Sequence, residues 1–143
     1  MKNSPSITNL AVALAKAQAE MPKVAFDKIN PFLGNKYATL GAVIETAKPI
    51  MAKYALSIVQ FPVSEEGRVG VRSVLMHESG EYIEDTITVV PEPKKGLSVN
   101  QSAGVTITYL RRYALASILG LYSEEDVDGN DDGQEGSGKA NEK

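Results

Sequence analysis

The first half of the chain contains two stretches in which apolar residues recur at the spacing of an amphipathic helix. The first covers residues 6–21 and ends before Pro22, which cannot continue a helix. The second begins after Thr39, a suitable N-cap, and carries the clearest apolar stripe in the chain. Its members are Leu40, Val43, Ile44, Ala47, Ile50, Met51 and Tyr54. Pro49 lies inside this stripe and predicts a kink or a break near Lys48.

The middle of the chain has the alternating pattern of β-strands. Three stretches, residues 56–63, 68–77 and 81–90, are rich in β-forming residues and are separated by short turns around Gly67 and Gly80. In the second stretch, Arg68, Gly70, Arg72, Val74 and Met76 share one face, and the residues between them share the other. Turns this short predict an antiparallel meander.

A last helix follows the strands. Ser98 and Gln101 have the spacing of a capping box, although a start at Ser102 fits equally well, and Gly120 can end the helix. One face collects the apolar residues Ala103, Ile107, Leu110, Ala114, Ile118 and Leu121. The sequence therefore predicts an α+β fold, in which a three-stranded antiparallel meander is packed by the C-terminal helix and preceded by two helices. Residues 1–5 predict a frayed end, and residues 22–38 an irregular linker.

The charge is distributed unevenly. The 143 residues carry a net charge of -3, with 15 Lys and Arg against 18 Asp and Glu. Residues 1–122 have a positive balance, whereas residues 123–143 are strongly acidic and almost free of apolar side chains. We therefore expect one folded domain over 1–122 and a disordered acidic tail over 123–143. A basic body with an acidic tail is common in proteins that handle nucleic acid, and a tail that only aids solubility fits the charges equally well.

The composition excludes several classes of chemistry. There is no Cys and only one His, His77, which rules out a disulfide scaffold, a thiolate zinc site and a cysteine nucleophile. The segment 133–139 has the spacing of a phosphate-binding loop, but Ala140 stands where Ser or Thr should bind magnesium. We therefore expect a protein that is not an enzyme and has no metal or cofactor. No signal peptide or membrane-spanning run is visible, so we expect it in the cytoplasm.

The remaining signal is a set of basic residues interleaved with aromatic ones. Single-stranded nucleic acid is bound by this combination, because cations follow the phosphates and flat rings stack on the bases. The candidate DNA-binding residues are Lys36, Tyr37, Arg68, Arg72, Lys94, Lys95, Tyr109, Arg111 and Arg112. Structural alternatives stay open: Tyr113 is expected in the core, Arg111 could belong to a buried ion pair, and Lys94 and Lys95 could form a solvated loop.

Several of these residues carry a family resemblance. The linker from Asn30 to Leu40, the helix segment from Thr108 to Leu115 with Gly120 and Leu121, and the acidic stretch 124–130 are similar to the Erf (essential recombination function) family. These are single-strand DNA annealing proteins of bacteriophages and prophages. The resemblance implies an ATP-independent recombinase and a fold like that of the eukaryotic annealing-ring proteins. Some family members have a longer C-terminal domain, which this chain does not match.

The resemblance also implies partners. These are single-stranded DNA, the annealed duplex, further copies of the chain in a ring or filament, and a host single-strand-binding protein as a candidate for the acidic tail. If the chain is phage-encoded, it would act in the cytoplasm of the host bacterium, away from any membrane. Three alternatives remain open from the residues: a protein that protects single strands without annealing them, an accessory interaction protein, and a nuclease.

Overall fold

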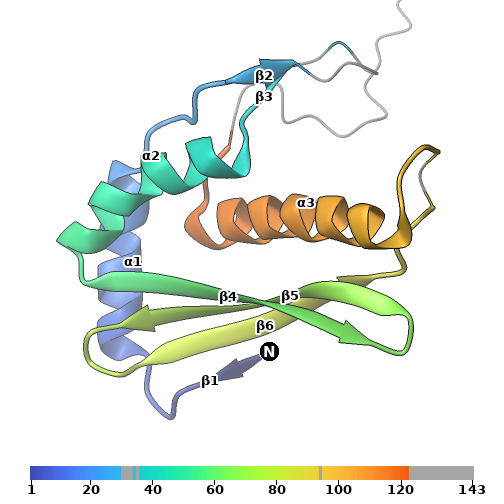
Figure 1. The fold of residues 1–143 in the computed structure, drawn as a ribbon. Helices are drawn as coiled ribbons and strands as arrows, with labels where there is room; N and C mark the ends of the chain where they lie inside the picture. The colour runs from blue at the N-terminus through green and yellow to red at the C-terminus, as the bar shows by residue number, and fades with distance from the viewer. Residues whose placement is uncertain (30–33, 35, 94, 123–143) are drawn as a thin grey trace, which may run out of the picture.

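The computed structural model describes residues 1–29, 34, 36–93 and 95–122 of the chain, and it shows an α+β fold with antiparallel sheets (Figure 1). The elements are β1 (Lys2–Asn3), α1 (Thr8–Glu20), β2 (Lys28–Ile29), β3 (Lys36–Tyr37), α2 (Leu40–Lys53), β4 (Leu56–Glu65), β5 (Arg68–His77), β6 (Tyr82–Val89) and α3 (Val99–Leu119). The predicted α+β class is therefore confirmed. The predicted acidic tail lies outside the described residues.

The main sheet has the strand order β1-β6-β5-β4, so consecutive strands β4, β5 and β6 are neighbours. It has one strand more than expected, because Lys2 and Asn3 pair with Glu84 and Ile83 at its edge. The prediction of a frayed N-terminus is thus wrong. Ser4 explains why: its backbone N–H donates to the Tyr82 carbonyl at 2.9 Å, and its hydroxyl accepts from the Tyr82 N–H at 2.9 Å.

The two faces of this sheet differ. α3 lies across one face and α1 stands at its end, as Figure 1 shows. In β5, Val71, Ser73 and Leu75 are buried on the α3 side. The other face bears Arg72 and Val74, with residues of β4 and β6 beside them. We call this second face, which none of the described helices covers, the open face of the sheet.

The N-terminus of α1 is capped from a distant part of the chain. Ile7, at the N-cap position, makes no side-chain cap. Instead the carboxylate of Glu81, just before β6, accepts from the Leu10 backbone N–H at 2.9 Å and from the hydroxyls of Ser6 and Ser79. A carboxylate at this position satisfies backbone N–H groups and complements the helix dipole. Glu81 therefore ties α1 to the sheet, a contact that sequence spacing cannot reveal.

α2 begins as predicted, with the Thr39 hydroxyl accepting from the Ala42 N–H. The helix passes through Pro49 without a break, so the possibility of a break near Lys48 is excluded. Its apolar side packs with α3 and the segment after it to form one of the two core clusters, which includes Val43 and Leu115. The second cluster joins α1 to β4 and β5.

α3 begins with the predicted capping box of Ser98 and Gln101, and Gly120 ends it in the left-handed conformation. Both predictions are confirmed, and the alternative start at Ser102 is wrong. The linker before α2 is more ordered than predicted, because Lys28 pairs with Tyr37 and Ile29 with Lys36 to form the short β2–β3 hairpin. No helix within the described residues is long and apolar enough to cross a membrane.

Candidate nucleic-acid interface

Along one flank of α3 two stacked aromatic rings are exposed to solvent. Tyr109 and Tyr113 are one helical turn apart, their ring centroids are 6.2 Å apart, and their exposed fractions are 55% and 53%. The Arg112 guanidinium lies over the Tyr109 ring, 5.6 Å from its centroid. We call these three residues the outer face of α3. The expectation that Tyr113 belongs to the core is wrong, because the helix turns that residue to the rim of the α3–β6 contact.

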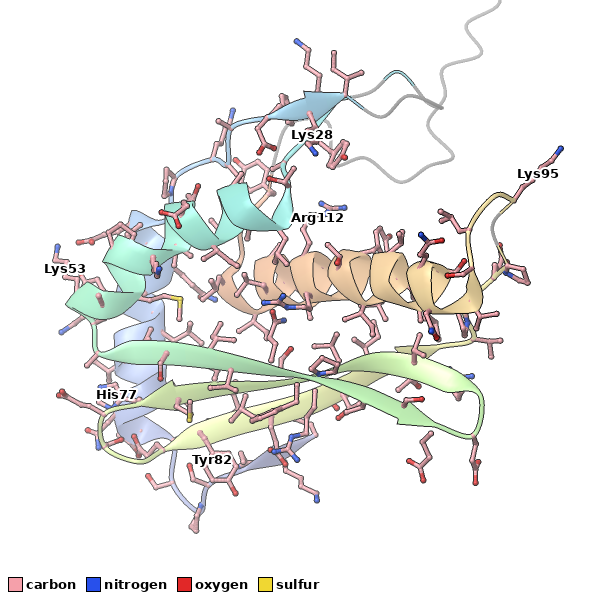
Figure 2. The ribbon with its side chains drawn as sticks, in the orientation of Figure 1. Lys28, Lys53, His77, Tyr82, Lys95 and Arg112 are labelled. Atoms are coloured by element: carbon pink, nitrogen blue, oxygen red, sulfur yellow. The ribbon has the colours of Figure 1, made fainter. Side chains whose placement is uncertain are left out.

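The β2–β3 hairpin lies on the side of α3 opposite the main sheet (Figure 1). It carries Lys28, Lys36 and Tyr37, and both lysines are exposed. Figure 2 shows Lys28 on the hairpin and Arg112 on the side of α3 toward it. Arg112 also shares a small cavity with Ala38, the residue that follows β3. The structure therefore brings the predicted residues Tyr37, Tyr109 and Arg112 to one side of the molecule, whereas Lys36 projects from the other face of the hairpin.

The base of this hairpin is anchored to the start of α2 by Asp27. Its carboxylate accepts from the Thr39 backbone N–H at 2.7 Å and from the Thr39 hydroxyl at 2.5 Å. These hydrogen bonds lower the pKa of the Asp27 carboxyl below its usual range, and the bond from the Thr39 hydroxyl has the larger effect. In the hairpin register Lys28 lies opposite Tyr37 and Lys36 opposite Ile29, so the two lysine side chains project from opposite faces of the hairpin. The sequence interpretation missed Lys28, although the alternation of aromatic and basic residues around it was a usable signal.

Lys95, a further predicted cation, lies on the same side of the molecule (Figure 2). Lys95 is exposed in the loop that leads into the helix, and Figure 2 shows it at the N-terminal end of α3, far from Arg112 along the helix axis. From Ser98 to Arg112 the helix rises by about 21 Å, so Lys95 could contact only a ligand several nucleotides long. Lys94 lies outside the described residues.

Arg111 does not join this side. It points between α2 and β4, where it lines a cavity of about 340 Å³ with Lys48, Gln60 and the aliphatic side chains around them. Its Nε atom exposes less than 1 Å² and has no hydrogen-bond partner in the part of the chain that the structure describes. No ion pair among those residues includes Arg111 either, so the expectation of a buried ion pair is not met.

Arg68 and Arg72 lie on the open face of the sheet, across the sheet from α3. Arg68 donates from Nε to the Thr88 hydroxyl at 3.0 Å and from a terminal nitrogen to the Thr88 carbonyl at 2.9 Å. Arg72 lies 5.1 Å from the centroid of the Phe61 ring, and its Nε is 3.7 Å from the Glu84 carboxylate. Sequence spacing correctly placed both arginines on one face of β5, but that face is separate from the outer face of α3.

The described residues contain no group of three or more His, Asp or Glu side chains that could hold a metal ion. His77 ends β5 at a turn, where its Nδ1 accepts from the Ser79 backbone N–H at 3.1 Å. That hydrogen bond gives His77 a structural role in the turn. The near-match to a phosphate-binding loop at 133–139 lies outside the described residues.

Comparison with known proteins places the chain in a family. It is 29% identical over 104 residues to the "Essential recombination function protein" of Salmonella phage P22, an alignment that covers 71% of this chain and 51% of the phage protein. The chain thus spans about half the length of that relative. No solved structure gives a significant match. The profile of the ERF superfamily matches residues 10–143, nearly the whole chain, and the protein therefore belongs to the ERF superfamily.

Proposed function

We propose that this protein binds single-stranded DNA and anneals complementary strands, without nucleotide hydrolysis, in the homologous recombination of a bacteriophage. The observation that carries the proposal is the outer face of α3, where two exposed, stacked tyrosines adjoin a guanidinium beneath a hairpin with two exposed lysines. Membership of the ERF superfamily and the name of the phage P22 relative support the recombination role.

Each part of this interface has a distinct role in the proposal. Arg112 and Lys28 contact phosphates, while the rings of Tyr109 and Tyr113 offer stacking surfaces to bases of any identity. Because each neutralised phosphate releases counterions, the affinity should fall steeply as salt is added. Lys95 extends the path of the strand toward the N-terminal end of α3.

Annealing needs little chemistry from the protein. Bound strands are held close together with their backbone charge partly neutralised, and base pairing supplies both the specificity and most of the free energy. One subunit has few cations, so it should bind DNA weakly. We therefore include in the proposal an assembly of several copies, in a ring or filament, whose linked sites raise the effective concentration for one strand. A host single-strand-binding protein is proposed as a further partner.

A binding titration tests the interface. Fluorescence anisotropy of a fluorescein-labelled oligothymidine is measured with the full chain at about 50 mM and 200 mM salt. We expect salt-sensitive binding, and a loss of about tenfold in affinity for Tyr109→Leu, since stacking on one ring contributes about 1–3 kcal/mol per base. The matched control is Phe61→Leu, which removes an exposed aromatic ring beside an arginine on the open face and should leave the affinity unchanged. Salt-independent binding, or equal losses in both variants, would contradict the proposed interface.

A pairing assay separates annealing from its alternatives. Two complementary strands, one carrying a fluorophore and the other a quencher, are mixed with and without the protein. Accelerated quenching supports annealing, whereas slowed quenching indicates a protein that protects single strands. Absence of salt-sensitive binding in the titration would instead favour an accessory interaction protein. Shortened strands after the addition of magnesium would indicate a nuclease.

A further inference from the structure

Arg111 is an anomaly that the proposed interface does not use. A guanidinium is always charged, and burying one of its N–H groups without a partner costs free energy. The Nε of Arg111 is in that position, and no carboxylate of the described residues forms an ion pair with the side chain. A partly buried cation that lacks a counter-charge in its own domain suits an anionic ligand supplied from elsewhere.

The cavity around Arg111, which we call the α2–β4 groove, indicates what else the ligand must offer. Its volume is about 340 Å³, and its lining combines a polar rim with an aliphatic floor. The polar lining residues are Lys48, Ser57, Gln60 and Arg111. The aliphatic lining includes Ile44, Met51 and Leu115. None of the lining residues is aromatic, so the groove lacks the stacking surface that single-stranded nucleic acid uses. An acidic peptide with an aliphatic side chain is the better match in both charge and polarity.

This chain contains such a peptide. Glu124, Glu125, Asp126 and Asp128 surround Val127, which is the single large apolar residue of the acidic tail. The segment lies outside the described residues, but the described chain ends just before it, at Tyr122. Each copy of the protein therefore carries both a cationic groove and a segment of complementary charge.

Tyr122, the last described residue before the segment, lies at a cavity other than the groove. That cavity is also lined by Val24, Ala38 and Val43, and the Val24 N–H donates to the Tyr122 carbonyl at 3.3 Å. The groove is lined by Ile44, Lys48 and Met51 of α2, none of which lines the Tyr122 cavity. The test below distinguishes a segment bound to a second copy, which assembles the protein, from one bound to its own chain, which leaves it monomeric.

We propose that the acidic segment 124–128 of a second copy occupies the α2–β4 groove, with its carboxylates on Arg111 and Lys48 and Val127 on the aliphatic floor. Groove and segment are different surfaces, so the contact is head-to-tail and generates a ring or an open filament. This inference deepens the assembly part of the proposed function and rests on it. DNA binding by the outer face of α3 does not depend on it.

Two full-length variants, each lacking one half of the contact, provide the test. Arg111→Glu reverses the charge in the groove, and the combined change Glu124→Gln, Glu125→Gln, Asp126→Asn and Asp128→Asn neutralises the segment. Analytical ultracentrifugation over a range of concentrations should show wild-type assemblies. Each variant alone should need a concentration at least about tenfold higher to assemble. A mixture of the two should form a one-to-one complex and nothing larger, because only one functional contact remains.

Controls keep the result interpretable. Arg72→Glu makes the same charge change on the open face and should assemble like the wild type. Lys48→Glu, at the exposed rim, should weaken assembly without entering the core, which covers the case in which Arg111→Glu does not fold. Wild-type-like assembly of the neutralised variant would overturn the inference, as would a wild type that stays monomeric. The inference would also be overturned if adding Arg111→Glu to the neutralised variant abolished DNA binding. That result would mean that the groove binds a DNA phosphate instead of the acidic segment. The anisotropy titration tests the outer face of α3 separately.

Discussion

Two arginine–aromatic pairs lie on opposite sides of this molecule and are nearly alike in local geometry. On the outer face of α3, the Arg112 guanidinium is 5.6 Å from the Tyr109 ring centroid. On the open face of the sheet, that of Arg72 is 5.1 Å from the Phe61 ring centroid. Both rings are about half exposed. A cation over a ring is therefore too common an arrangement to identify a nucleic-acid site by itself.

The surroundings of the two pairs differ. Arg72 has the Glu84 carboxylate 3.7 Å from its Nε, and only 18% of the Glu84 side chain is exposed, so a carboxylate already accompanies the cation there. Arg112 lies on the side of the molecule that also carries Lys28 (Figure 2). We infer that the number of cations near one another, which steers a polyanion, distinguishes the proposed DNA-binding face from the other.

The largest expected effect tests the sheet that separates the two faces. A Cβ atom added at Gly70 would lie 1.9 Å from the Ile87 carbonyl oxygen and 2.8 Å from the Thr88 Cα, and both are backbone atoms that cannot easily move. Gly70→Ala should therefore lower the free energy of unfolding by about 3 kcal/mol or more. Urea unfolding measures this. Gly104→Ala, on α3 with open space around it, is the control and should stabilise the protein by about 0.5–1 kcal/mol. Equal stability of the two variants would mean that β5 and β6 are not packed as described.

The next prediction compares the two arginines directly. Arg112→Ala should reduce the affinity for a labelled oligothymidine by about tenfold. It should also reduce the slope of log affinity against log salt concentration by about one, as expected for the loss of one phosphate contact. Arg72→Ala should change neither by more than about twofold, because its cation already faces Glu84. Anisotropy titrations at several salt concentrations measure both quantities. A larger loss for Arg72→Ala would reverse the assignment of the two faces.

A smaller effect concerns the contact that holds α1 at the end of the sheet. Burial raises the pKa of the Glu81 carboxyl, but hydrogen bonds from the Leu10 N–H and the hydroxyls of Ser79 and Ser6 outweigh it and leave the pKa below the usual 4.5. The ionised form is thus stabilised in the native state. This stability is fully present above the usual pKa and is lost as the pH falls through the lower native pKa.

At pH 7, Glu81→Gln should accordingly lower the melting temperature by roughly a few degrees, because the neutral amide is a weaker cap for the N-terminus of α1. The difference from the wild type should shrink as the solution becomes acidic, where the wild-type carboxylate is itself protonated. Calorimetric scans at neutral and acidic pH measure the difference. A deficit that is the same at both pH values would show that the charge of Glu81 is unimportant. DNA binding should stay unchanged at neutral pH.

The smallest expected effect sharpens the comparison of the two faces. Glu84→Gln removes the carboxylate beside Arg72 and leaves the Phe61 pair in place. If neighbouring charge is what distinguishes the faces, this change should create weak DNA binding on the open face. The slope of log affinity against log salt concentration should then rise by about one, as expected for one added phosphate contact. Adding Arg72→Ala to Glu84→Gln should cancel the gain. An unchanged slope in Glu84→Gln would mean that more than charge separates the two faces.

Local patterns predicted the elements well wherever neighbouring residues determine them. The residue range 68–77 of β5, the Thr39 cap, the capping box at Ser98 and the end of α3 at Gly120 all follow from sequence spacing and are confirmed. The membership of the ERF superfamily also follows from the residues that carry the resemblance. The position of Tyr113 was wrong because it lies at the edge of the apolar stripe, where a small rotation of the helix decides between core and solvent.

Contacts between distant parts of the chain were beyond such patterns. The pairing of Lys2 with Glu84 and the cap that Glu81 gives to α1 join residues more than 70 positions apart. Strands of only two residues, such as β1 and β2, show no hydrophobic periodicity in the sequence. Their pairing therefore depends on the strand beside them. The same limit applies to the candidate site. Each basic residue was visible, but nothing local indicated that the sheet would separate Arg72 from Arg112.

The amino-acid sequence by itself determined the three helices and the three long strands, the caps of α2 and α3, the turns between the strands, the family and the chemistry available for a polyanion. These depend on backbone preferences and on side-chain spacing within a few residues. Only the tertiary structure decided which cations share a surface, that Arg111 turns into a groove where no carboxylate of the described residues pairs with it, and that Arg72 is accompanied by Glu84. The reason is physical: electrostatic and packing energies depend on distance in space, which the order of residues along the chain does not specify.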